Sequence, residues 1–258
     1  MKFDMKFDKP TLVTITAPTC SGKSYLLDLM TKADPFVEAT MFKTLFSRIV
    51  STTTRPKRTG EVDGFDYHFI SADESKRMEA VCQFAELIEF RGARYGVTKA
   101  EMDGKMSGEL APIIVLEPQG LKIYEQMCWD NGWEIFKIYV TVEESVRLKR
   151  LNARTAIDIR DAVFDAYQNA LGAGVMHHIP ALEATEKHIK VHTDRVLSIT
   201  GDERRWRASN SWDLIIPGDD HKKAIQDIEQ GIKWRNHRNA QLNTSTLGSA
   251  IVHAIFSL

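Results

Sequence analysis

An apolar run, a glycine-containing loop and a helical pattern follow one another near the start of this chain. Leu12–Ile15 has the composition of a buried strand, and the apolar residues between Leu26 and Met30 have the spacing of a helix. Between them lies the loop Ala17–Ser24, with the sequence APTCSGKS. A strand, a tight loop and a helix N-terminus gather backbone N–H groups and the positive end of a helix dipole, which together favour an anion.

This loop matches the pattern G-x-x-x-x-G-K-[ST] except at its first position, where Ala17 replaces glycine. The added methyl is tolerable if φ there is negative. In such a loop Lys23 reaches the outer phosphates of a nucleoside triphosphate and the Ser24 hydroxyl coordinates Mg²⁺. A polar turn that caps a helix is the alternative, but the flanking strand and helix favour phosphate binding. The predicted nucleotide-binding residues are Ala17, Pro18, Thr19, Cys20, Ser21, Gly22, Lys23, Ser24 and Tyr25.

Composition excludes some partners. The chain has 258 residues, 27% of them charged, and a formal net charge of -1, so no basic field draws it to nucleic acid or to an anionic membrane. Its three cysteines have no metal-ligand spacing, which is typical of reduced thiols. The first residues lack the apolar core of a signal peptide. We therefore expect a cytoplasmic protein with no membrane or nucleic-acid partner; whether it is a homodimer stays open.

Strand and helix patterns alternate along the chain. Strands are predicted at Arg48–Ser51, Pro112–Leu116, Ile135–Val142 and Leu214–Ile216, and a hairpin at Glu86–Tyr95. Helices are predicted at Asp73–Phe84, Leu121–Trp129, Val142–Ala153 and His221–Arg235. Continuous apolar runs separated by helices indicate a parallel sheet covered on both faces, so the predicted fold class is α/β.

Three further motifs stand in a fixed order. They are STTTRPKRTGEVDGFDYHF at 51–69, ELIEFRGARYG at 86–96 and LEPQG at 116–120. Together with the first loop, they closely resemble the signature of the guanylate kinase family. The resemblance runs from about residue 11 to 154 and resumes at 212–235, whereas 161–210 fit it poorly.

The resemblance implies a P-loop kinase fold: a parallel sheet flanked by helices, a small acceptor-binding subdomain and a helical lid. On that basis 1–258 form one domain with a core at 11–47, 110–145 and 212–236. The nucleoside monophosphate-binding subdomain is 48–100, the lid with a divergent helical insertion is 146–210, and 237–258 are a C-terminal tail.

The residue types of the acceptor segment suit a nucleoside monophosphate. Arg55 and Arg58 lie three apart on a segment stiffened by Pro56, so both can face one phosphate, although solvated surface arginines would show the same pattern. A carboxylate such as Glu86 accepts two N–H bonds from guanine that adenine cannot supply. The predicted acceptor-binding residues are Ser51, Arg55, Arg58, Tyr67, Glu86, Tyr95, Val97, Thr98 and Glu117.

Two departures from the family pattern leave the base open. Val97 stands where the family has a hydroxyl residue that donates to guanine O6, and strand alternation sends Thr98 to the opposite face unless the hairpin is bulged. The family carries two aspartates, spaced by one residue, at the buried strand. In this chain Val115 occupies the first position and Glu117 the second, so only the second is acidic. GMP, dGMP and a related purine monophosphate all remain acceptor candidates.

Phosphoryl transfer needs cations over the transferred group. Arg147, Arg150 and Arg154 lie on one predicted helix, and the resemblance implies lid arginines there, with Arg160 as a further candidate. Arg204, Arg205 and Arg207 are a competing cluster, and a solvated helix face is the alternative for either. The predicted catalytic residues are Lys23, Arg55, Arg58, Arg150, Arg154 and Arg160.

The resemblance implies an ATP-dependent nucleoside monophosphate kinase that uses Mg²⁺ with ATP. A non-catalytic interaction domain of the same fold is one alternative, but it has no need of Lys23, Ser24 or a lid. A kinase that acts on a modified nucleotide or another phosphate-bearing acceptor is the second alternative.

Overall fold

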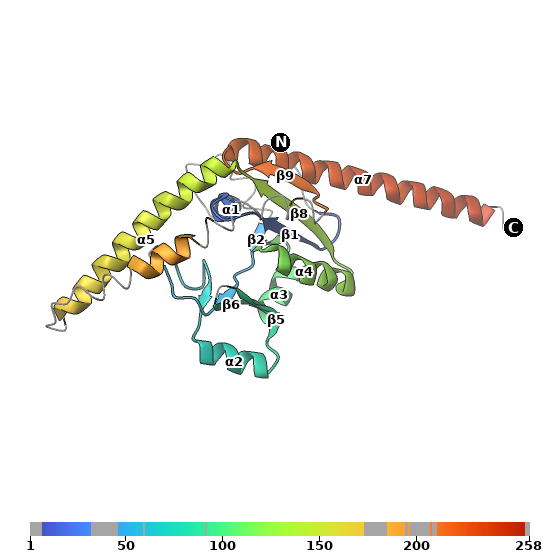
Figure 1. The fold of residues 1–258 in the computed structure, drawn as a ribbon. Helices are drawn as coiled ribbons and strands as arrows, with labels where there is room; N and C mark the ends of the chain where they lie inside the picture. The colour runs from blue at the N-terminus through green and yellow to red at the C-terminus, as the bar shows by residue number, and fades with distance from the viewer. Residues whose placement is uncertain are drawn as a thin grey trace.

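The computed structural model describes residues 7–31, 46–58, 60–90, 92–172, 185–193, 196, 207 and 211–255. It has the expected α/β architecture, with a central sheet, flanking helices and a second, smaller sheet below it (Figure 1). No helix in these described ranges is long and apolar enough to cross a bilayer.

The central sheet has five parallel strands in the order β2-β7-β1-β8-β9. The strands are β1 Thr11–Thr16, β2 Phe46–Arg48, β7 Ala111–Leu116, β8 Glu134–Thr141 and β9 Leu214–Pro217. Every residue of β1 is buried, as expected of a central parallel strand covered on both faces.

Alternate side chains of β1 enter two separate cores. Val13 and Ile15 join apolar residues of α1 (Lys23–Thr31) and α7 (His221–Ile255). Leu12 joins residues of α4 (Pro118–Asn131) and α3 (Lys99–Met106). Helices α1 and α7 therefore cover one face of the sheet, and α4 covers the other.

The smaller sheet has the order β4-β3-β6-β5. Its strands are β3 Thr52–Thr53, β4 His68–Phe69, β5 Phe84–Phe90 and β6 Ala93–Thr98, and α2 (Ala72–Ala80) connects β4 to β5. The hairpin predicted around Gly92 is present, with Gly92 at φ +75°, and its register shifts between Phe84 and Glu86. This sheet lies within the segment predicted to bind the acceptor.

Several predicted boundaries were wrong. The strand predicted at Arg48–Ser51 is β2, which ends at Arg48, and the helix predicted to reach Phe84 ends at Ala80 because Cys82 has φ +55°. Helix α5 (Glu144–Gly172) continues far beyond Ala153, and α7 continues beyond Arg235. The division of the chain into core, lid and tail stays a prediction. Both long helices extend away from the sheet (Figure 1).

Candidate active site

The loop between β1 and α1 has the backbone of an anion-binding turn. Gly22 has φ +87°, and a Cβ there would lie 3.1 Å from the carbonyl oxygen of Gly218, so glycine is required for two reasons. Ala17 is fully buried and is not among the residues with positive φ, which agrees with the tolerance expected for its methyl. Lys23 opens α1, and the next residue, Ser24, is exposed.

The Lys23 ammonium lies across the loop. Its Nζ donates to the carbonyl oxygen of Ala17 at 3.0 Å and to Glu117 Oε1 at 3.0 Å. Glu117 follows β7 and precedes α4, at the carboxyl edge of the sheet, and its side chain makes no helix-capping bond. A cation at a helix N-terminus, paired with an exchangeable carboxylate, is suited to receive a phosphate.

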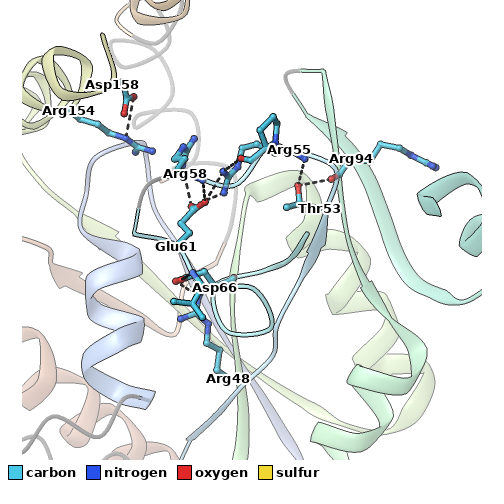
Figure 2. Close-up of polar contacts among 11 residues, drawn as sticks. Arg48, Thr53, Arg55, Arg58, Glu61, Asp66, Arg94, Arg154 and Asp158 are labelled. Carbon is cyan, nitrogen blue, oxygen red and sulfur yellow. Dashed lines mark hydrogen bonds and ion pairs between the residues drawn. The ribbon is translucent and has the colours of Figure 1, made fainter. Parts of the chain in front are cut away.

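Arg55 and Arg58 converge on one carboxylate, that of Glu61 (Figure 2). Arg55 binds it through both terminal nitrogens, at 2.9 and 2.8 Å. Arg58 Nη1 lies 3.8 Å from Glu61 Oε1, and its backbone N–H donates to Oε2 at 2.8 Å. The expectation that both arginines can face one anion thus has a geometric basis, and the anion here is a side chain of the chain itself.

Arg55 and Glu61 each stabilise the ionised form of the other. Burial lowers the pKa of Arg55, but the hydrogen bonds and charge of Glu61 outweigh burial and raise it. Burial likewise raises the pKa of Glu61, and the hydrogen bonds from Arg55 and Arg58 outweigh it and lower that pKa. The Arg55 guanidinium also lies 5.2 Å from the ring centre of Tyr67. An aromatic wall and an acidic partner therefore hold the guanidinium in place.

One pocket brings most of the predicted acceptor-binding residues together. Ser51, Tyr67, Glu86, Tyr95 and Glu117 line it, and Lys23 of the phosphate loop lines it as well. The rings of Tyr67 and Tyr95 meet edge to face, with centres 6.1 Å apart. Apolar side chains complete the wall: Ile88, Phe90, Ile114, Val115 and Leu116.

Glu86 is the buried acid of this pocket. It is 8% exposed, and burial raises its pKa to about 7, against the effect of a hydrogen bond from Tyr124. The Tyr124 hydroxyl donates to Glu86 Oε2 at 3.4 Å. Sequence reasoning missed Tyr124, because an aromatic residue on a helix has the pattern of an ordinary core residue.

Val97 and Thr98 do not line the pocket. Val97 is fully buried in the core beneath α4, opposite Glu86 in the hairpin. Thr98 caps α3, its hydroxyl accepting the backbone N–H of Glu101 at 3.2 Å. The bulge considered for this hairpin is present, but the cap gives the Thr98 hydroxyl a different partner.

The predicted lid arginines have different surroundings. Arg150 Nη1 donates to the carbonyl oxygens of Cys20 at 3.3 Å and Gly218 at 3.5 Å, so it reaches the phosphate loop. Arg154 Nε lies 4.0 Å from Oδ2 of Asp158, which is on the same helix (Figure 2). The Arg160 side chain is 73% exposed and pairs with Asp161.

The remaining candidate arginines are less informative. Arg147 is fully buried and donates to the carbonyl oxygen of Val142 at 3.2 Å, so it belongs to the core. Arg204 and Arg205 lie outside the described residues, and Arg207 is exposed. Among the lid candidates within the described ranges, Arg150 therefore contacts the phosphate loop.

Comparisons with known proteins agree with this geometry. A family model, guanylate kinase, matches residues 9–171. The chain is 37% identical to the guanylate kinase of Symbiobacterium thermophilum over 247 residues, 93% of each chain. It is 26% identical to that of Protochlamydia amoebophila, over 90% of this chain and 95% of the relative. Against that of Sphingopyxis alaskensis, 30% identity extends over 55% of this chain and 60% of the relative.

A solved guanylate kinase from Anaplasma phagocytophilum aligns over 90% of this chain and 89% of its own, with 16% identity and a TM-score of 0.49. The family assignment follows from the family model, which covers more than half of the chain, and from the relative that is aligned along nearly its whole length. The chain belongs to the guanylate kinase family.

Proposed function

We propose that this enzyme transfers the γ-phosphoryl group of ATP to GMP or dGMP. The observation that carries the proposal is the shared pocket, in which Lys23 of the phosphate loop lies with Tyr67, Tyr95 and Glu86. Transfer requires the donor and acceptor phosphates to meet in line, and a pocket that joins the two sets of residues provides this proximity.

On the donor side, the loop amides and Lys23 bind the outer phosphates of ATP. The Ser24 hydroxyl, exposed beside Lys23 at the start of α1, is a hard oxygen ligand of the kind that Mg²⁺ accepts together with phosphate and water oxygens. The residues present therefore fit a magnesium ion that arrives with ATP, and such an ion supplies charge neutralisation between the phosphates. Arg150 adds positive charge beside the loop, where charge develops on the transferred group.

On the acceptor side, the phosphate of the monophosphate replaces the Glu61 carboxylate between Arg55 and Arg58. In this exchange the phosphate accepts two hydrogen bonds from Arg55, whose two terminal nitrogens already bind the Glu61 carboxylate in this way. Tyr67 and Tyr95 line the route from this clamp to the base pocket. The same clamp would serve the monophosphate of any base, so the arginines determine binding of the phosphate and not the choice of base.

Base selection is assigned to Glu86. An ionised carboxylate accepts the N1–H and N2–H groups of guanine, whereas adenine presents an acceptor at N1, so an adenine would leave the buried acid unpaired. Val97 offers no hydroxyl to guanine O6. The deoxy form is included because no described pocket residue obviously demands a 2′-hydroxyl. We also propose a cytoplasmic location, since the free thiols Cys20, Cys82 and Cys128 suit a reducing compartment.

The test is an assay of ADP release with every ribo- and deoxynucleoside monophosphate in turn. We expect GMP and dGMP to be turned over and AMP to be slower by a factor of at least about 10². A protein that is active only on a pyrimidine monophosphate would contradict the base assignment. A protein inactive with every monophosphate would contradict the kinase assignment.

A further inference from the structure

A buried hydrogen bond joins α4 to the acid of the base pocket. Tyr124 of α4 is fully buried, and its hydroxyl donates to Glu86 Oε2 at 3.4 Å. Glu86 belongs to β5, so the bond connects the helix that covers the central sheet to a strand of the smaller sheet. The distance is longer than the usual range for an O–H···O bond, so the bond is a weak one.

The two oxygens of Glu86 have different surroundings. Oε2 accepts from Tyr124, on the core side. Oε1 faces Gly120, where a Cβ would lie 3.8 Å away, and Gly120 lines the pocket. Across the hairpin, Val97 pairs with Glu86 and is fully buried, and its side chain has no donor to offer. Tyr124 therefore fixes one oxygen and leaves the other directed toward the pocket.

The tyrosine acts on Glu86 as a donor. Burial and the nearby charge of Glu86 raise the pKa of Tyr124 well above its usual value, so the hydroxyl keeps its proton at neutral pH. Its hydrogen bond favours the ionised form of Glu86, while burial raises the pKa of that acid to about 7. Other titratable groups line the same pocket from neighbouring elements: Lys23, Tyr67, Tyr95 and Glu117.

We propose that Tyr124 is a positioning residue for base recognition, which holds one oxygen of Glu86 so that the other is presented to the N–H edge of guanine. This inference rests on the proposed guanine nucleotide kinase activity. Tyr124 does not touch the nucleotide; it acts through Glu86. A role of this kind changes the affinity for the base and its pH dependence, and leaves the phosphoryl-transfer machinery unchanged.

The test is Tyr124→Phe, which keeps the buried ring and removes the hydroxyl. At pH 7 we expect KM for GMP to rise roughly threefold to tenfold, the effect of one hydrogen bond, with kcat and KM for ATP unchanged. The pH midpoint of kcat/KM for GMP should move upward, because the bond that favours the ionised acid is lost. Calorimetry of GMP binding without ATP should give the same loss of affinity.

Tyr139→Phe is the matched control, since Tyr139 is another fully buried tyrosine, on β8, that does not line the pocket. It should leave the GMP affinity and the pH midpoint unchanged. These readouts separate a positioning role from the structural cost of changing a buried tyrosine.

The inference is overturned if folded Tyr124→Phe has the KM and pH midpoint of the wild type, or if Tyr139→Phe loses GMP affinity equally. If Tyr124→Phe is too unstable for kinetics, the same comparison of GMP affinity is made by calorimetry at low temperature, where a loss of less than about threefold overturns the inference and a larger loss supports it. Failure of the proposed function is distinct, because the wild-type enzyme itself would then not phosphorylate GMP.

Discussion

At the scale of single residues, carboxylates of the chain itself hold two of the predicted phosphate-binding cations. Glu117 pairs with Lys23, and Glu61 with Arg55. Both pairs are only partly exposed, so the cations are oriented before a nucleotide arrives. Because a phosphate replaces a carboxylate, each cation keeps an anionic partner, and the displaced carboxylate has to turn toward solvent.

Removing the bidentate arginine tests the acceptor clamp. Arg55→Ala should lower kcat/KM for GMP by roughly 2–4 kcal/mol, the scale for loss of a desolvated charged contact, with little change in KM for ATP. Arg77→Ala is the control, because Arg77 pairs with Glu74 on the exposed face of α2. Steady-state kinetics with each substrate varied would check this. Loss of ATP affinity with GMP affinity kept would mean that the two substrate sites are assigned in reverse.

The raised pKa of Glu86 predicts opposite pH trends for affinity and stability. GMP needs the ionised acid, so its affinity should rise as pH increases through about 7. The free enzyme binds an extra proton at Glu86 between the unfolded value of 4.5 and about 7, so its stability should fall as pH rises through this range.

Thermal unfolding with and without GMP, measured from pH 5 to about 9, checks both trends, since ligand stabilisation follows affinity. The shift in Tm caused by GMP should grow with pH. Glu86→Gln should reduce this pH dependence to the part that titration of the GMP phosphate contributes, and it should weaken GMP binding, because an amide N–H opposes the guanine donors. A GMP-induced shift that is constant across pH would show that Glu86 does not contact the base.

At the scale of elements, α5 carries Arg150, the predicted lid arginine, to the phosphate loop. Arg150→Ala should reduce kcat about 10²-fold or more, the scale for a cation that stabilises transferred charge, with little change in Tm. Lys149 is the matched control, because it is the adjacent cation and is exposed. Kinetics of the two variants would check this, and equal activity would assign Arg150 to packing of the loop alone.

The strands could be predicted because the central sheet is parallel and buried, which makes each strand a continuous apolar run. The ends of α5 and α7 could not, since their outer turns leave the core and no proline or glycine stop signal ends them near the predicted boundaries. For the same reason, the sequence predicts the helix that carries the lid-arginine candidates, but not the direction in which that helix leaves the sheet.

Predicted site residues with a motif around them, such as Lys23 and Arg55, each pair with a carboxylate of the chain, and their roles stay predictions. Glu61 and Tyr124 were missed because each matters only through a contact made after folding. Thr98 is the opposite case, a residue predicted for the site whose hydroxyl instead caps α3. That cap depends on where α3 begins, which the sequence does not determine. The local sequence pattern therefore predicts the cations, whereas the carboxylates that pair with them depend on tertiary contacts.

At the scale of the whole molecule, the pocket lies between the two sheets. Glu117 follows a strand of the central sheet, whereas Glu86 and Tyr95 belong to the smaller sheet. Lys23 comes from the helix that follows β1, and Ser51 precedes β3. The predicted phosphate-binding lysine and the proposed base-reading acid come from different parts of the fold, so the proposed transfer depends on the packing of the two sheets.

The most direct measurement follows the phosphoryl group itself. ATP labelled at the γ-phosphate is incubated with GMP, Mg²⁺ and either the wild-type enzyme or Lys23→Ala, and the labelled products are separated. The account predicts labelled GDP with the wild type and, from a folded Lys23→Ala, almost none, since the transferred charge loses its partner. Label released only as inorganic phosphate, or labelled GDP formed at a near-normal rate by Lys23→Ala, would contradict it.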